Sequence, residues 1–346
     1  MSEDTSLPFP ESLPDFQRLF PNDTACATYL ERMRWRDGFL CPKCSERGDP
    51  YRFAKRPQVL RCRVCKRDVS LTAGTIMERT HSPLSTWFWA AYLVSTQMPG
   101  MSARQFGRQI GINRYETAFQ ILHKLRAAMV RPNADRIGKG KSVAHVEMDE
   151  TLIGGVTRGE GKGVHHMRYV VGAVEACERA PVVDGKRVTK AMLRRAGTYA
   201  GRLRLRVLPD RTGILNFARE SIAQGTIVHT DDYAGYASLD IECGLHHNAI
   251  AERGDRNVAE RHLPLIHLVF SNLKSWLLGT HHSVSDHHLQ AYLNEFTFRF
   301  NRRFYPFNGF RSLLGLGAVS ESPTYDELYS YAWTHPVAAG PWELTG

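Results

Sequence analysis

The sequence predicts a multidomain chain in which a small zinc ribbon and an all-α helix-turn-helix segment precede an α/β domain with a mixed sheet. Three observations support this: two matched Cys-x-x-Cys pairs, a helix–glycine turn–helix pattern after them, and strand-like apolar runs beyond residue 142. With 346 residues, 42% of them hydrophobic, the chain can bury several cores. Without an apolar run of membrane-spanning length or a secretory signal, we expect a cytoplasmic protein with no membrane partner.

The order of these patterns along the chain gives five expected parts. An N-terminal helical segment at 1–35, with one helix over 15–35, leads into the zinc ribbon at 36–75. The helix-turn-helix segment is expected at 80–131, the α/β domain at 143–315 and a C-terminal tail at 316–346. Within the α/β domain we expect strands at 143–148, 169–174, 203–208 and 226–230, and helices at 212–224, 264–278 and 286–300.

Four of the seven cysteines form two pairs, Cys41 with Cys44 and Cys62 with Cys65, separated by 17 residues. Each pair can form a tight turn whose thiolates point at one ion, and two such turns complete the tetrahedron of a structural Zn²⁺ site. The alternatives are a redox dithiol or unrelated thiols, which the matched spacing disfavours. We therefore expect structural Zn²⁺, with its binding coupled to folding of the ribbon.

The chain is basic, and its positive charge is clustered. Lys and Arg number 45 against 35 Asp and Glu, a formal charge of +10. Between Glu31 and Asp68 there are 12 basic and 5 acidic side chains, so this short stretch supplies +7. Clustered positive charge favours a surface that faces phosphates, and nucleic acid is the most common polyanionic partner.

Residues 102–129 have the pattern helix, three-residue turn, helix. Ser102 is placed to cap the first helix, and the turn falls at 111–113. In a helix-turn-helix, side chains at the start of the second helix reach base edges in DNA. Asn113, Arg114 and Thr117 are therefore candidate DNA-binding residues. The alternative is a plain helical hairpin that links two domains.

Two aspartates stand where strands of the α/β domain are expected to end. Asp149 follows the first predicted strand and Asp231 the fourth. Carboxylates from two neighbouring strands can share Mg²⁺ or Mn²⁺, and two such ions can hold both oxygens of an in-line phosphoryl transfer. A single Asp at a strand end is more often a turn residue, so the prediction of a metal site rests on the two aspartates together. The adjacent Glu150 and Asp232 should point to the opposite face.

The helix expected at 264–278 offers a third ligand. His267 and Lys274 are seven residues apart and lie on one side of the helix, whereas Asn272 lies about 140° around from His267 at ~100° per residue. Lys274 is suited to pair with phosphate, which favours His267 as the ligand and leaves Asn272 as the alternative. Without the two aspartates, His267 would be read as an ordinary surface histidine.

At these residues the chain resembles bacterial insertion-sequence transposases of the group with an N-terminal zinc ribbon and an RNase H-like, DDE-type catalytic domain. The resemblance covers about residues 15–315 and rests on Cys41–Cys65, SARQFGRQIGINRYETAFQILHKLR, MDETLIGG, TDDYAGY and SNLKSWLLGTHHSVSDHHLQAYLNEFTFRFNRR. It implies that Asp149 and Asp231 are the first two catalytic residues. His267 then takes the third acidic position, where related groups have His or Asn, and Lys274 contacts DNA phosphate near the cut.

The resemblance also implies an activity and its partners. The protein would bind double-stranded DNA at terminal inverted repeats, and metal-bound water would free a 3′-OH that attacks target DNA in line. We expect a homo-oligomer on DNA, associated with the bacterial nucleoid. The alternatives are a catalytically inactive or domesticated zinc-ribbon DNA-binding protein, and a nuclease that cuts without strand transfer.

Overall fold

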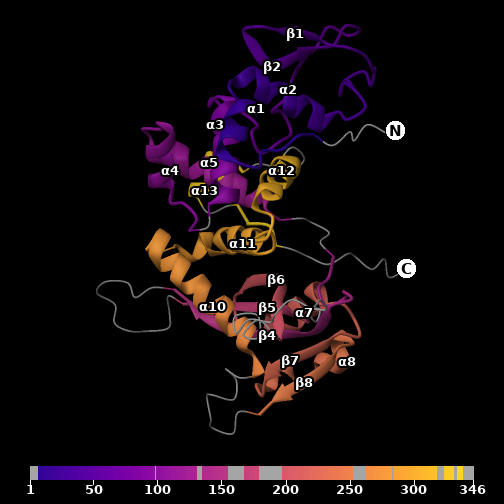
Figure 1. The fold of residues 1–346 in the computed structure, drawn as a ribbon, viewed down its shortest axis with the longest axis vertical. Coiled ribbons are helices and arrows are strands. Elements are labelled where there is room, and N and C mark those ends of the chain that lie inside the picture. Colours follow the sequence, from indigo (N-terminus) through magenta and orange to yellow (C-terminus); the bar gives the residue numbers. More distant parts are fainter. Residues whose placement is uncertain are drawn as a thin grey trace, which may run out of the picture. The chain divides into compact units, whose positions relative to one another are not determined.

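The chain forms two compact units in the computed structural model, which describes residues 7–97, 99–130, 135–154, 167–178, 197–251, 262–282, 284–317, 323–330 and 333–337. The first unit contains Met1–Met129 and Arg302–Thr334, and the second contains Val130–Asn301 and His335–Gly346. Figure 1 shows the helices and strands of both units with their labels.

The N-terminal segment contains two helices, α1 (Leu13–Leu19) and α2 (Asp23–Arg34), so the prediction of a single helix over 15–35 was wrong. Pro21 lies between them, and its ring cannot continue α1. Asn22 then caps α2, because its side-chain oxygen accepts a hydrogen bond from the Ala25 N–H at 3.0 Å.

The ribbon follows as a three-stranded antiparallel sheet of β1 (Tyr51–Phe53), β2 (Arg56–Arg61) and β3 (Asp68–Ser70). Of its three strands, only Leu60 and Val69 are buried, and they pair directly across β2 and β3. Such a small core supports the expectation that metal binding and folding of the ribbon are coupled.

Three helices come next: α3 (Leu84–Thr96), α4 (Ala103–Ile110) and α5 (Tyr115–Ala128). The predicted pair of helices and its turn are present in α4 and α5. Ser102 caps α4 by accepting the Gln105 N–H at 3.2 Å, and Gly111 ends it at a φ of +73°, a left-handed conformation that favours glycine.

The C-terminal helices α12 (Pro306–Gly317) and α13 (Tyr325–Tyr329) belong to the first unit. Phe310 of α12 is fully buried, and its ring centroid lies 5.8 Å from that of Phe16, 5.5 Å from that of Phe20 and 6.1 Å from that of Phe88. This aromatic cluster joins residues almost 300 positions apart in sequence. The expected boundary at 315 therefore differs from the division in the structure, where residues after 301 pack with the N-terminal helices.

α3 has no N-cap of its own, because Pro83 offers no side-chain acceptor. The Asp23 carboxylate, 61 residues earlier, accepts the N–H groups of Leu84 and Ser85 at 3.2 and 2.9 Å. We expect Asp23→Ala to lower the free energy of unfolding by about 1 kcal/mol, as loss of a helix cap does. Urea unfolding measures the change. Asp37→Ala, at an exposed position, is the control, and an equal effect of both variants would contradict the capping role.

The second unit is built on a five-stranded mixed sheet, which confirms that prediction. Its order is β6-β5-β4-β7-β8; β4, β5 and β6 pair antiparallel, whereas β7 is parallel to both β4 and β8. The strands are β4 (Val143–Ile153), β5 (Arg168–Glu178), β6 (Thr198–Leu208), β7 (Ile227–Asp231) and β8 (His246–Ile250). The short, polar β8 was not predicted. Asp149 lies inside β4 rather than at its end, because pairing with β5 continues to Ile153.

Helices cover both faces of this sheet. One face packs on α7 (Ile214–Ser221), η3 (Ala234–Tyr236) and α8 (Leu239–Cys243), in a core with Met148 and Phe217; the short helix η2 (Arg211–Gly213) leads into α7. The other face packs on α10 (Pro264–Trp276), η4 (Leu277–His281) and α11 (Leu289–Phe300), in a core with Val170 and Phe270; the short helix η5 (Asp286–His288) leads into α11. Within the described ranges, no helix has the length and apolarity to cross a membrane.

A buried carboxylate on β5 makes the stability of this unit depend on pH. Burial alone would raise the pKa of Glu175, but hydrogen bonds from the Arg202 side chain and from the Gly138 and Arg202 amides hold it below the usual 4.5. Because the folded-state pKa is lowered, the stabilisation is complete above about pH 4.5 and is lost as the pH falls through the folded-state value.

We expect Glu175→Gln to lower the free energy of unfolding by about 3 kcal/mol at pH 7, because it leaves Arg202 without its charged partner. The difference from wild type should shrink as the pH falls below about 4.5. Urea unfolding at a series of pH values measures this. Glu178→Gln, exposed on the same strand, should have little effect, and a difference that is constant with pH would contradict the assignment.

Candidate active site

The two predicted aspartates lie on neighbouring strands. β4 and β7 are parallel, with Val146 opposite Val228 and Glu147 opposite His229. Two residues further in the same register, Asp149 stands opposite Asp231, the last residue of β7. Residues in register on adjacent strands point to the same face and are about 4.8 Å apart along the hydrogen-bonding direction. The pairing of β4 with β7 therefore places the two aspartates side by side on one face of the sheet.

From α10, the side chain of His267 approaches Asp149. Its Nε2 atom lies 3.2 Å from Asp149 Oδ2. α10 can approach the sheet closely because Gly172, opposite Asp149 on β5, has no side chain. A Cβ there would lie 2.9 Å from Ile266 Cδ1 and 3.0 Å from Phe270 Cε1. Asn272 and Lys274 are both exposed further along α10.

The opposite face carries a polar group that sequence reasoning did not assign. Glu150 is almost fully buried, accepts a hydrogen bond from the Tyr236 hydroxyl and lies 3.0 Å from an Arg211 guanidinium nitrogen. Burial raises the pKa of the Glu150 carboxyl. The Tyr233 N–H donates to Asp231 Oδ1 at 3.2 Å. The hydrogen bond between Tyr236 and Glu150 thus connects β4, one residue after Asp149, to the segment that follows Asp231.

The donors of this site fit a divalent cation. Carboxylate oxygens are the preferred ligands of Mg²⁺ and Mn²⁺, and an imidazole nitrogen is compatible with the latter. Asp149, Asp231 and His267 would provide two negative charges, one fewer than three carboxylates. The arrangement is suited to binding a cation together with substrate phosphate oxygens.

The four paired cysteines form a second possible metal centre. All four Sγ atoms lie within 4.8 Å of one another, and the Cys41–Cys65 and Cys44–Cys62 Sγ distances are both 3.7 Å. A tetrahedron with Zn–S bonds of about 2.3 Å has edges of about 3.8 Å, which these distances match. The structure therefore brings the four predicted cysteines into an arrangement that fits a structural zinc ion.

The two cysteine pairs have the same turn geometry. Ser45 follows the first pair at a φ of +58°, and Lys66 follows the second at +57°. Their N–H groups donate to the carbonyls of Cys41 and Cys62 at 2.9 and 3.1 Å. Backbone amides also point at sulfur: that of Cys44 makes the largest contribution to lowering the pKa of the Cys41 thiol to about 6. At Cys41 the backbone thus favours the thiolate, the form that binds zinc. At Cys44 the Glu46 amide also lowers the pKa, but burial and hydrogen bonds with the other thiols outweigh it and raise the pKa to about 12.

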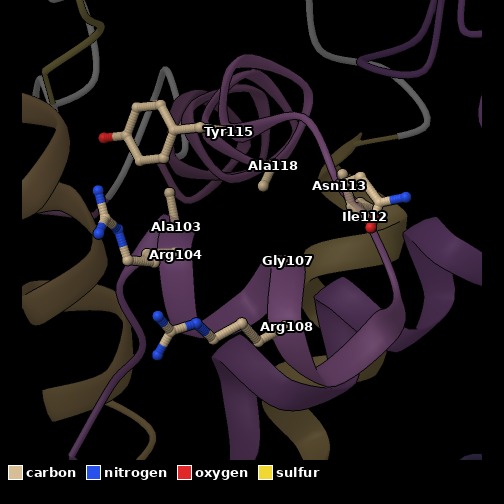
Figure 2. A pocket seen from close by; sticks show the side chains of 8 residues that line it. All are labelled: Ala103, Arg104, Gly107, Arg108, Ile112, Asn113, Tyr115 and Ala118. Carbon is tan, nitrogen blue, oxygen red and sulfur yellow. The ribbon is translucent and has the colours of Figure 1, made fainter.

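A hollow of about 290 Å³ lies between α4 and the start of α5 (Figure 2). Its lining includes the small residues Ala103, Gly107 and Ala118. A Cβ at Gly107 would lie 2.9 Å from the Ile112 carbonyl oxygen, so this glycine lets the turn close against α4. Figure 2 shows the Arg104 and Arg108 side chains extending to the same side of the hollow, with Asn113 toward its other end.

The hollow has a positive rim. Arg104, Arg108 and Arg114 are all exposed, and none forms an ion pair with another described residue. Asn113 and Thr117, the other predicted DNA-binding residues, lie at the turn and in the first turn of α5. Of the predicted residues, Asn113 thus lines the hollow together with two further arginines, Arg104 and Arg108.

Two family models match this chain. Residues 21–68 match a transposase zinc-ribbon domain, and residues 140–301 match an ISXO2-like transposase domain. The chain thus contains a zinc-ribbon domain and an ISXO2-like domain of the kind found in transposases. The chain is also 26% identical, over 82% of its length and 92% of the other's, to an uncharacterized protein in transposable element ISH50 of Halobacterium salinarum. No solved structure matches it. Its four paired cysteines lie in the first matched domain, and Asp149, Asp231 and His267 lie in the second.

Proposed function

We propose that this transposase cuts DNA at the ends of its element and joins the freed 3′-OH to target DNA by metal-dependent, in-line phosphoryl transfer. The observation that carries the proposal is the contact between His267 and Asp149, on the strand that pairs in register with the strand ending in Asp231. The mixed sheet with helices on both faces also supports an RNase H-like relationship for this unit.

The chain's own residues would act mainly through position and charge. Asp149, Asp231 and His267 would hold Mg²⁺ or Mn²⁺, which supplies Lewis-acid stabilisation of the charge that develops during phosphoryl transfer. Lys274, seven residues after His267 on α10, would bind a DNA phosphate next to the cut and fix the strand. Accurate placement of the reacting phosphate accounts for a large share of the rate in such reactions.

The first unit would supply DNA recognition. Asn113, Arg114 and Thr117 would contact base edges of the terminal inverted repeats, as the start of a recognition helix does. Arg104 and Arg108, at the rim of the hollow, would bind a backbone phosphate, and the basic ribbon would add further phosphate contacts. We propose a homo-oligomer that holds paired ends and target DNA, associated with the nucleoid.

Cleavage of a labelled duplex that carries the element's own ends, with Mg²⁺ or Mn²⁺ and a target plasmid, tests the proposal. The expected products are a nicked end with a 3′-OH and a joined end–target molecule. Binding without cutting under either metal would favour the DNA-binding alternative. Cutting without joined product would favour the nuclease alternative.

We expect the double variant Arg104→Ala/Arg108→Ala to weaken binding to end DNA and to unrelated DNA alike. The slope of log K against log salt should become less steep by about 2, because each lost phosphate contact removes about 0.9. Binding titrations at several salt concentrations measure the slope. The control Arg18→Ala/Arg79→Ala removes the same charge at exposed positions elsewhere in the unit. An equal change of slope in both would contradict a local phosphate site.

A further inference from the structure

Glu147 is a buried carboxylate that the proposed chemistry does not use. It lies two residues before Asp149 on β4, so both side chains point to the face that packs on α10. Glu147 is only 1% exposed. Its Oε2 atom accepts the N–H groups of Leu265 and Ile266 at 2.8 and 2.9 Å. A sheet residue thus binds the first turn of a helix 118 positions later in sequence.

α10 depends on this contact, because its own sequence provides no cap. Leu263 stands at the N-cap position without a side-chain acceptor, and Pro264 begins the helix. The first N–H groups of a helix have no partner within it, and a negative charge near them is favourable. Glu147 supplies both the acceptor and the charge.

The same turn of α10 carries His267. Ile266, whose N–H is bound by Glu147, directly precedes His267, whose Nε2 lies 3.2 Å from Asp149. Glu147 and Asp149 are two residues apart, about 6.6 Å along the strand. One helical turn is therefore held by two successive carboxylates on one face of β4, the first through its backbone and the second through its imidazole.

The other carboxylate oxygen of Glu147, Oε1, faces His145. Oε1 lies 3.9 Å from His145 Nε2, and the His145 ring stacks on that of His229 with centroids 4.1 Å apart. His229 stands opposite Glu147 on β7, the strand that ends in Asp231. The carboxylate is therefore confined between the two strands that carry the aspartates and the helix that carries the histidine.

From these contacts we infer that Glu147 is a positioning residue, which sets the place of His267 relative to Asp149 and thereby the affinity of the site for a divalent cation. The inference rests on the proposed function of Asp149, Asp231 and His267 as metal ligands. The role of Glu147 depends on the length of its side chain. A shorter side chain would not reach the Leu265 and Ile266 amides, so the start of α10 could move. Loss of an outer contact to a metal ligand typically weakens metal affinity 10- to 100-fold.

Two conservative variants separate reach from charge. Glu147→Asp keeps the charge but shortens the side chain by one methylene, whereas Glu147→Gln keeps the reach and an acceptor oxygen but loses the charge. The matched control is Glu175→Asp, the same change at another buried carboxylate of this sheet, which accepts backbone N–H groups but does not contact α10. Mn²⁺ binding followed by electron paramagnetic resonance and amide hydrogen exchange of Leu265 and Ile266 are the readouts.

We expect Glu147→Asp to raise the Kd for Mn²⁺ at least about 10-fold and to speed exchange of both amides. Glu147→Gln should change the Kd by less than about threefold, since it retains a neutral hydrogen bond. Glu175→Asp should leave Mn²⁺ affinity unchanged. Wild-type affinity and exchange in Glu147→Asp, or equal weakening by Glu175→Asp, would overturn the inference.

An Asp149→Ala arm distinguishes this inference from the proposed function. If Asp149→Ala binds Mn²⁺ as tightly as wild type, the proposed metal site is wrong. The inferred effect of Glu147 on metal affinity is then wrong as well. If Asp149→Ala loses Mn²⁺ but Glu147→Asp does not, the metal site stands and only the role of Glu147 is refuted.

Discussion

Asp149→Ala and Asp231→Ala are each expected to lower the rate of end cleavage at least about 1,000-fold, while affinity for end DNA stays within about twofold of wild type. Each variant removes a charged oxygen ligand, and loss of several kcal/mol of transition-state stabilisation corresponds to at least this factor. DNA affinity should persist because the proposed recognition surface lies in the other unit. Single-turnover cleavage of labelled end DNA, with a parallel gel-shift titration, measures both quantities.

The third ligand is tested by a matched pair on one helix. His267→Ala should reduce cleavage strongly, because His267 contacts Asp149, whereas Asn272→Ala should cut nearly as wild type does, because Asn272 is exposed. Both residues lie in α10, so a general loss of that helix would affect the two variants alike. An inactive Asn272→Ala beside an active His267→Ala would show that the wrong residue was assigned.

The second large effect is expected at the ribbon. Cys62→Ser should abolish stoichiometric Zn²⁺ binding and unfold the segment around β1–β3, because structural zinc contributes on the order of 10 kcal/mol to the folding of such small domains. The buried core of the ribbon strands is too small to replace this contribution. Zinc content by metal analysis and limited proteolysis within residues 36–75 give the two readouts.

The control for the ribbon is a cysteine outside it. Cys26 is fully buried in α2, and burial raises its pKa to about 12, so its thiol stays protonated. Cys26→Ala should therefore keep one Zn²⁺ per chain and the wild-type proteolysis pattern. Retention of zinc by Cys62→Ser would refute the four-cysteine site.

The parts predicted well from the sequence depend on local chemistry. Spacing alone identified the four cysteines that the structure brings together, and Ser102 and Gly111 marked the start and end of α4. The helical period also selected the side chain on α10 that the structure brings to Asp149. In each case the decisive residues are close in sequence, so their spacing is enough to predict their arrangement in space.

The parts that were missed depend on contacts between distant residues. β8 is short and polar and is defined only by pairing with β7. The break between α1 and α2 is the exception, because Pro21 is a local signal that the prediction of one helix over 15–35 overlooked. Glu147 and Glu150 looked like ordinary members of an acidic strand. They are distinguished only by their contacts with distant residues, Glu147 with the start of α10 and Glu150 with Tyr236.

The burial of Phe310 among the aromatic rings of the first unit also constrains truncation of this protein. In chain order, residues 130–301 are an insertion within a discontinuous domain, which is completed only when the segment from Arg302 onward has been synthesised. A fragment that ends before α12 would leave Phe16, Phe20 and Phe88 without this partner. Fragments of the chain that end before α12 are therefore expected to fold the first unit less stably than the whole chain does.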